Sequence, residues 1–144
     1  MRNHKQEPER CFIDTNILLY AFIETDNSQK RLRAREIVQN PNAVISTQVV
    51  NETCVNLLKK TALQEQDIRE LITGFYERYL VAEINRFTLL AASEIREKLR
   101  LSFWVSLVVA SALCADCTVL YTEDLQHGLN IEEKLTVVNP FLEL

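Results

Sequence analysis

Short apolar runs alternate along the chain with longer segments in which apolar residues recur every three or four positions. The runs predict buried strands, and the longer segments predict helices that cover them. The predicted strands comprise residues 11–13, 43–45, 81–84, 118–121 and 135–138. This alternation is typical of α/β proteins, and the sequence therefore predicts a three-layer α/β domain.

The predicted helices begin next to residues that commonly cap helix N-termini. The expected caps are Thr15 or Asn16, Ser28, Ser46 or Thr47, and Ser102. Residues 61–80 predict one helix or a pair, because Gly74 weakens the pattern, and residues 87–99 predict an amphipathic helix. The segment 103–115 is almost entirely apolar but shorter than the ~20 residues of a membrane span, so we expect a buried helix.

The composition is that of a globular domain, since 47% of the 144 residues are hydrophobic and 25% are charged. Residues 1–10 form a polar tail without the apolar segment of a secretory signal, so we expect one cytoplasmic domain over residues 11–144. The two glycines are too few for a three-glycine dinucleotide motif or a glycine-rich phosphate loop. The net charge of −4 argues against a protein that coats nucleic acid, so nucleic-acid binding would need a local site.

Two acids follow predicted strands, at the sheet edge where ligands of α/β proteins usually bind. Asp14 comes directly after the first strand, and Asp124 lies shortly after the fourth. Glu52, on the helix after the second strand, could reach the same edge. Converging carboxylates repel one another unless a hard cation compensates, so this pattern indicates a Mg²⁺ or Mn²⁺ site. The plainer alternative is a cap at Asp14, a solvated Glu52 and a turn at Asp124, and spacing alone leaves both open.

Three segments resemble the motifs of PIN-domain nucleases, especially the VapC-type toxins of prokaryotic toxin–antitoxin pairs. They are FIDTNILLYA over residues 12–21, STQVVNE over residues 46–52 and VLYTEDLQHG over residues 119–128. The order and the spacing of the motifs also fit, so the resemblance extends from Cys11 to Pro140. It implies a PIN-like α/β/α domain with a parallel sheet of about five strands wrapped by helices.

The resemblance also implies an activity, because members of this family cleave RNA at a cluster of acids that binds Mg²⁺ or Mn²⁺. By motif, the catalytic and metal-binding acids would be Asp14, Glu52 and Asp124. Asn16 would orient the first aspartate, and Thr122 would be the hydroxyl residue beside the last one. The implied partners are RNA and a small antitoxin, in a homodimer or a dimer of toxin–antitoxin heterodimers, with no membrane involved.

One position departs from the family pattern. The string Leu-Ser-Phe-Trp at residues 101–104 is normally followed by an aspartate that is a principal metal ligand, and here the residue is Val105. A valine offers no oxygen to a cation that prefers oxygen ligands. We therefore expect a weakened metal site and little or no ribonuclease activity. The chain would be a natural inactive member or an active nuclease disarmed by substitution, and the otherwise intact motifs favour the second.

Other functions stay open at this point. The chain could be a nuclease-dead PIN domain that binds RNA or an antitoxin without cutting. A regulatory domain that binds Mg²⁺ for phosphotransfer is disfavoured by the three motif matches. Arg31 and Arg35 share a helix face and could bind RNA phosphates or an acidic partner, or form a solvated face.

The remaining candidate side chains have plain structural alternatives. Cys114 and Cys117 have the spacing of a redox pair or half a zinc site, but we expect packed thiols. His127 could touch a phosphate, although a turn residue is the simpler expectation. Phe103 and Trp104 could stack on a base, but at the start of an apolar helix we expect core packing.

Overall fold

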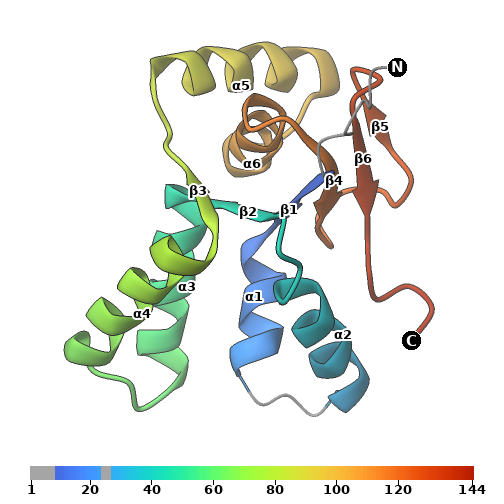
Figure 1. Ribbon diagram of the computed structural model, residues 1–144. Coiled ribbons are helices and arrows are strands. Elements are labelled where there is room, and N and C mark those ends of the chain that lie inside the picture. Colours follow the sequence, from blue (N-terminus) through green and yellow to red (C-terminus); the bar gives the residue numbers. More distant parts are fainter. Residues whose placement is uncertain (1–8, 24–26) are drawn as a thin grey trace, which may run out of the picture.

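The computed structural model describes residues 9–23 and 27–144. In this part of the chain six strands form one sheet, in the order β3-β2-β1-β4-β6-β5 (Figure 1). The strands are β1 (Arg10–Ile13), β2 (Ala43–Ser46), β3 (Leu80–Ala82), β4 (Cys117–Tyr121), β5 (Asn130–Ile131) and β6 (Leu135–Val138). Strands β1, β2, β3, β4 and β6 are parallel, and β5 pairs with β6 in the antiparallel direction. The predicted α/β class with a mostly parallel sheet is confirmed.

Six helices of the described residues cover this sheet. They are α1 (Thr15–Phe22), α2 (Ser28–Val38), α3 (Thr47–Lys60), α4 (Glu65–Arg78), α5 (Arg86–Leu99) and α6 (Phe103–Cys114). Figure 1 shows α5 and α6 on one side of the sheet and α1 to α4 on the other, so the sheet is the middle of three layers. Among the described helices, none has the length and apolar character needed to cross a bilayer.

The five predicted strands are all present, with ends that differ by at most two residues from the prediction. The sequence did not predict β5, because a strand of two residues is too short to show a pattern. Residues 61–80 contain a single helix, α4, which continues through Gly74. Of the predicted polar tail, residues 1–8 lie outside the described residues, and Arg10 belongs to β1.

The cap of α1 is neither of the two expected residues but Asp14, as in the plainer alternative for this acid, and this bears on function. Asp14, rather than Thr15 or Asn16, is the N-cap, because its carboxylate accepts a hydrogen bond from the backbone N–H of Thr15. The acid that follows β1 therefore belongs to the first turn of α1 and has little freedom to move.

Two other helix caps agree with the prediction and one does not. Ser46 and Ser102 cap α3 and α6 as expected. Asn27, rather than Ser28, caps α2, because its side-chain oxygen accepts a backbone N–H of the first turn. Asparagine and serine have similar capping strength, so the sequence could not choose between neighbours.

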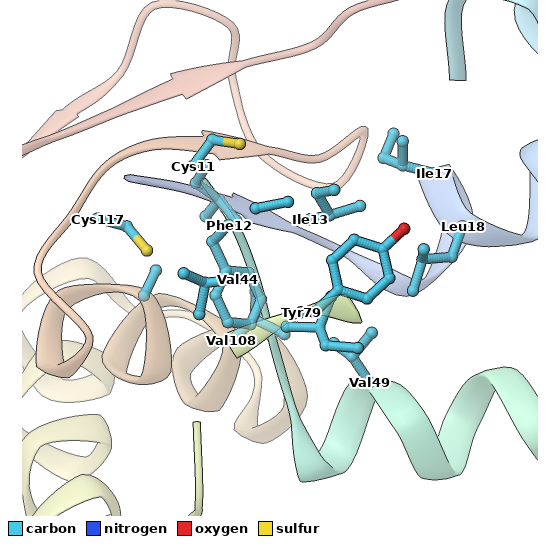
Figure 2. Close-up of a cluster of buried hydrophobic side chains, with 14 of the residues drawn as sticks. Cys11, Phe12, Ile13, Ile17, Leu18, Val44, Val49, Tyr79, Val108 and Cys117 are labelled. Carbon is cyan, nitrogen blue, oxygen red and sulfur yellow. The ribbon is translucent and has the colours of Figure 1, made fainter. Parts of the chain in front are cut away.

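The core is centred on β1. Phe12 and Ile13 are completely buried, and β1 lies between β2 and β4 in the sheet. Figure 2 shows Phe12 in one cluster with Val44 of β2 and Val108 of α6. Because β1 is packed on all sides, the residue that follows it starts from a fixed position inside the molecule.

Three of the four cysteines are packed thiols, and the prediction of a packed thiol is confirmed for Cys117. Cys11, Cys54 and Cys117 are buried and free, and burial raises the pKa of the Cys117 thiol to about 12. The prediction is wrong for Cys114, which is exposed at the end of α6. An uncharged buried thiol is a poor nucleophile, so Cys117 fits a core residue and not a redox centre.

Candidate functional site

The register of the central strands brings Asp14 and Thr122 together. Ile13 of β1 pairs with Tyr121 of β4 in parallel, so the residues that follow them lie side by side. The backbone N–H of Asp14 donates to the carbonyl of Tyr121 over 3.1 Å. The Thr122 hydroxyl donates to Asp14 Oδ2 over 2.8 Å, while the N–H of Thr15 donates to Oδ1 over 2.8 Å. Both oxygens of the buried Asp14 carboxylate are thus held by the protein.

Glu52 reaches the same edge from α3. Its Oε2 accepts a hydrogen bond from the Thr15 hydroxyl over 2.7 Å, and its Oε1 accepts one from Gln48 Nε2 over 3.0 Å. Thr15 therefore connects the two acids, donating to Asp14 with its N–H and to Glu52 with its hydroxyl. Sequence reasoning assigned no site role to Thr15 or Gln48, although the i, i+4 spacing of Gln48 and Glu52 on a helix could have indicated this contact.

Asp124 completes the group from the loop after β4. Its backbone N–H donates to Thr122 Oγ1 over 3.1 Å, so Thr122 holds both aspartates. The three predicted acids, Asp14, Glu52 and Asp124, line one cavity of about 50 Å³. The other residues that line this cavity are Gln48, Trp104, Val105, Val108, Leu120, Thr122 and Leu125. We call it the acid cavity.

The acids of the cavity influence one another electrostatically. The pKa of Asp14 is raised to about 6, chiefly because burial disfavours its charged form, and the negative charges of Asp124 and Glu52 raise it further. The hydrogen bonds from Thr122 and Thr15 act in the opposite direction, because they stabilise the carboxylate. An aspartate with a pKa this far above its ordinary value, in a cavity with other acids, is typical of a functional site.

The chemistry of these side chains fits a hard divalent cation, which prefers oxygen ligands and compensates converging negative charges. Gln48 adds a further oxygen, since its buried Oε1 has no hydrogen-bond partner among the described residues. Glu52 fixes this orientation of the amide, because a carboxylate accepts hydrogen bonds and so faces the Gln48 nitrogen. Even so, residues 9–23 and 27–144 contain no group of three His, Cys, Asp or Glu side chains that could hold a metal ion.

Val105 lies on the wall of the acid cavity, in the first turn of α6. Its backbone N–H donates to the capping hydroxyl of Ser102 over 3.2 Å, and its side chain is half-buried among the residues of the cavity. The position that lacks the expected aspartate is therefore one from which a carboxylate would face Asp14 and Asp124. A carboxylate there would also lie at a helix N-terminus, where the helix dipole favours negative charge.

Asn16, to which the resemblance gave an orienting role, is exposed, and it makes no hydrogen bond to Asp14. The residues that orient Asp14 are Thr15 and Thr122. His127 lies at the turn before Gly128, where its Nδ1 accepts the backbone N–H of Asn139 over 3.1 Å. This is the turn role that the sequence suggested as the simpler alternative.

The basic helix α2 lies outside the acid cavity. Arg35 Nε donates to the carbonyl of Ala21 in α1 over 3.3 Å, and Arg31 is half-buried. Neither arginine lines the acid cavity. The sequence did not predict the ion pair of the neighbouring Lys30, whose Nζ lies 3.3 Å from a carboxylate oxygen of Glu123, the residue before Asp124. The ion pair therefore ties α2 to the loop that carries Asp124.

The aromatic pair at the start of α6 is not packed in the core, so that prediction is wrong. Phe103 is 71% exposed and Trp104 is 65% exposed. The apolar pattern of residues 103–115 did not reveal this, because an apolar pattern does not show that the first two residues of α6 are exposed while residues 108–112 are buried. Trp104 is one of the residues that line the acid cavity.

Comparison with known proteins gives a family match and several structural likenesses. The family model of the PIN domain matches residues 11–128. A toxin–antitoxin complex from Klebsiella pneumoniae contains a similar chain, with a TM-score of 0.68 and 18% identity over 91% of this chain and 98% of that one. Among curated proteins, no sequence gives a significant match.

Two further solved structures have the same fold. VapC20 of Mycobacterium tuberculosis, a toxin that cleaves the sarcin-ricin loop, gives a TM-score of 0.61 at 17% identity over 79% of this chain and 89% of that one. VapBC2 of Rickettsia felis, bound to a promoter DNA fragment, gives 0.58 at 18% identity over 88% and 96%. At these identities the likenesses show the fold alone.

Proposed function

The chain belongs to the PIN-domain family, and from this premise we propose that it is a VapC-type endoribonuclease toxin, weakened by the valine at position 105. One observation carries the proposal: Asp14, Glu52 and Asp124 line a single cavity at the carboxyl ends of β1 and β4. The reaction would be hydrolysis of RNA phosphodiesters with Mg²⁺ or Mn²⁺. A cytoplasmic location would fit an RNA substrate.

The residues of the acid cavity would have different roles in this reaction. Asp14 and Asp124 would be the direct ligands of the cation, and Glu52 would be a further ligand. A bound divalent cation would supply charge compensation at the scissile phosphate and activation of water. Thr122 and Thr15 hold the carboxylates in place through the hydrogen bonds described above. Asp14 is fully ionised only above its raised pKa of about 6, so cation binding would weaken as the pH falls below that value.

A second candidate function rests on Val105. Its apolar side chain on the wall of the acid cavity favours, as the alternative, a nuclease-dead PIN domain that binds RNA or an antitoxin without cutting. For the ribonuclease the proposed partners are RNA and a small antitoxin, in a homodimer or a dimer of toxin–antitoxin heterodimers, and the alternative function needs only one of these two partners. Structures of similar fold that contain toxin–antitoxin complexes support the antitoxin partner.

The test is RNA cleavage by the Val105→Asp variant, followed on a labelled RNA with Mn²⁺ and with a chelator. We expect cleavage that requires the metal, little or no cleavage by the parent chain, and complete loss when Asp14→Ala is added to the variant. RNA or antitoxin binding without any cleavage by Val105→Asp would favour the nuclease-dead alternative. Absence of both binding and cleavage would contradict both functions.

A further inference from the structure

We propose that Trp104 is a stacking platform for one RNA base beside the scissile phosphate, so that the preferred substrate is single-stranded at this point. The inference rests on the proposed RNA-binding function and adds a specificity-determining residue to it. It starts from the exposure of Trp104, a residue that is 65% exposed although it lines the acid cavity.

The size of the acid cavity decides where the bases of a bound RNA must lie. A volume of about 50 Å³ corresponds to roughly two water molecules. The cavity can therefore admit an ion and a phosphate oxygen, but a nucleobase is too large to enter it. When a phosphate faces the acids, its neighbouring bases are left on the rim, where Trp104 is the aromatic residue that lines the cavity.

The two exposed aromatic residues of α6 differ in what covers them. The guanidinium of Arg96 lies 3.7 Å from the centroid of the Phe103 ring, and Arg96 Nη1 donates to the Ser106 hydroxyl over 3.0 Å. Ser106 in turn donates to the carbonyl of Phe103 over 2.8 Å. The Phe103 ring thus packs against the guanidinium of Arg96. In contrast, no ring or cation of the described residues stacks on Trp104.

The contacts of Arg96 also connect the first turn of α6 to α5 and bring a positive charge close to Trp104. The contacts of Arg96 with Phe103 and Ser106 connect α5 to the first turn of α6, the turn that carries Trp104. Arg96 places a positive charge against Phe103, the residue before Trp104 in the sequence. This charge is opposite in sign to the acids of the cavity. An exposed aromatic ring close to an arginine is an arrangement with which proteins bind single strands. A base in a duplex is already stacked on both faces, so it cannot use the ring.

The chain offers a direct probe of this contact, because Trp104 is its single tryptophan. Fluorescence of the parent protein therefore reports on this ring alone. We expect a short single-stranded RNA, added with Mg²⁺, to quench the emission, and the same RNA in a duplex to quench it far less. Anisotropy of a fluorescein-labelled RNA then gives affinities for the variants.

The expected affinities follow from the stacking contact. Trp104→Ala should weaken binding of the single strand about tenfold, and Trp104→Phe should restore most of that loss. The control is Phe87→Ala in α5. Phe87 is 71% exposed but does not line the acid cavity, so its removal should leave the affinity unchanged. The dependence of binding on salt should be the same for Trp104→Ala and the parent, since stacking releases no counterions.

The outcomes separate this inference from the proposed function. RNA that binds without quenching Trp104, or that binds Trp104→Ala as tightly as the parent, overturns the inference while RNA binding itself stands. Emission that changes with protein concentration and not with RNA means that a second copy of the chain covers the ring, which also overturns it. If no RNA binds and Val105→Asp does not cleave, the proposed function fails and the inference fails with it.

Discussion

Three acids line the cavity at the carboxyl end of β4, and three others line a cavity at its amino end. Asp116, Glu132 and Glu133 surround the second cavity, which has a volume of about 390 Å³, compared with about 50 Å³ for the acid cavity. The three acids of the amino end are all exposed, in turns with positive φ, and Lys134 is beside them. In the acid cavity, Asp14 is buried, Glu52 is half-buried and Asp124 is exposed, so the buried acid is Asp14.

Neither the number of acids nor the size of a cavity therefore identifies a functional site. Exposed carboxylates in turns are solvated, so gathering them costs little and requires no cation. A buried carboxylate such as Asp14, held by Thr122 and Thr15 and facing other acids, is unfavourable when charged and persists only because the fold fixes it. The free-energy cost of ionising a buried carboxylate therefore indicates a functional site. Experiments can measure this cost at both ends of β4.

The largest effect is expected from adding an acid at each end of α6. Val105 and Leu113 are both half-buried, and each lines one of the two cavities. Val105→Asp should bind Mn²⁺ at least tenfold more tightly than the parent. It should also lower the metal-free free energy of unfolding by about 3 kcal/mol, the repulsion of roughly one carboxylate pair at about 5 Å and an effective dielectric of ~20.

Leu113→Asp is the matched control for that experiment. It should lose stability as well, because a carboxylate near a helix C-terminus opposes the helix dipole, but it should gain no affinity for Mn²⁺. Titration calorimetry measures the affinities, and urea unfolding with a chelator measures the stabilities. Equal Mn²⁺ affinities for the two variants would contradict the distinction between the two cavities.

The next effect concerns pH. The folded-state pKa of Asp14, about 6, lies above that of an unfolded aspartate, so the folded protein binds this proton more tightly. Stability from this group is therefore fully present below about pH 4 and is lost as the pH rises through about 6, a change of about 3 kcal/mol. Asp14→Asn removes this pH-dependent contribution to stability, because an amide does not titrate. The parent should gain up to this amount over the variant between about pH 7 and pH 4, measured by urea unfolding with a chelator.

If the difference in free energy of unfolding between Asp14→Asn and the parent stays constant across this pH range, the raised pKa of Asp14 is contradicted. Asp116→Asn controls for the loss of one negative charge at the other end of β4. The comparison uses differences between variants, because acids far from the acid cavity contribute equally to the parent and to Asp14→Asn.

The sequence predicted the strands and the convergence of the acids for a clear reason. Strand β1 is a fully buried run, so its pattern is strong, and a parallel sheet places the residues after β1 and β4 at one edge. The position of the missing aspartate could also be predicted, because Val105 follows a recognisable string, and it lies on the cavity wall.

The parts that could not be predicted depend on tertiary contacts. Trp104 lies in an apolar run that predicts burial, and only the packing of α6 shows that its first turn is exposed. The links from Thr15 to Glu52 and from Lys30 to Glu123 join residues 37 and 93 positions apart, which no local pattern reveals. Side-chain partners of this kind follow from the fold and were therefore visible only in the structure.

The smallest effect is expected from removing the hydroxyl of a threonine at either end of β4. Thr122 donates to Asp14 over 2.8 Å and accepts from the N–H of Asp124, whereas Thr118, at the amino end of β4, donates to the carbonyl of Arg10 over 3.5 Å. Thr122→Val should lower the free energy of unfolding by about 2 kcal/mol near pH 7, because it removes a buried hydrogen bond to a charged group, and Thr118→Val by about 0.5 kcal/mol. The Thr122→Val loss should shrink near pH 4, where Asp14 is protonated and the hydrogen bond no longer stabilises a charge. Urea unfolding at both pH values measures this, and equal losses for the two variants would show that the two ends of β4 do not differ as we infer.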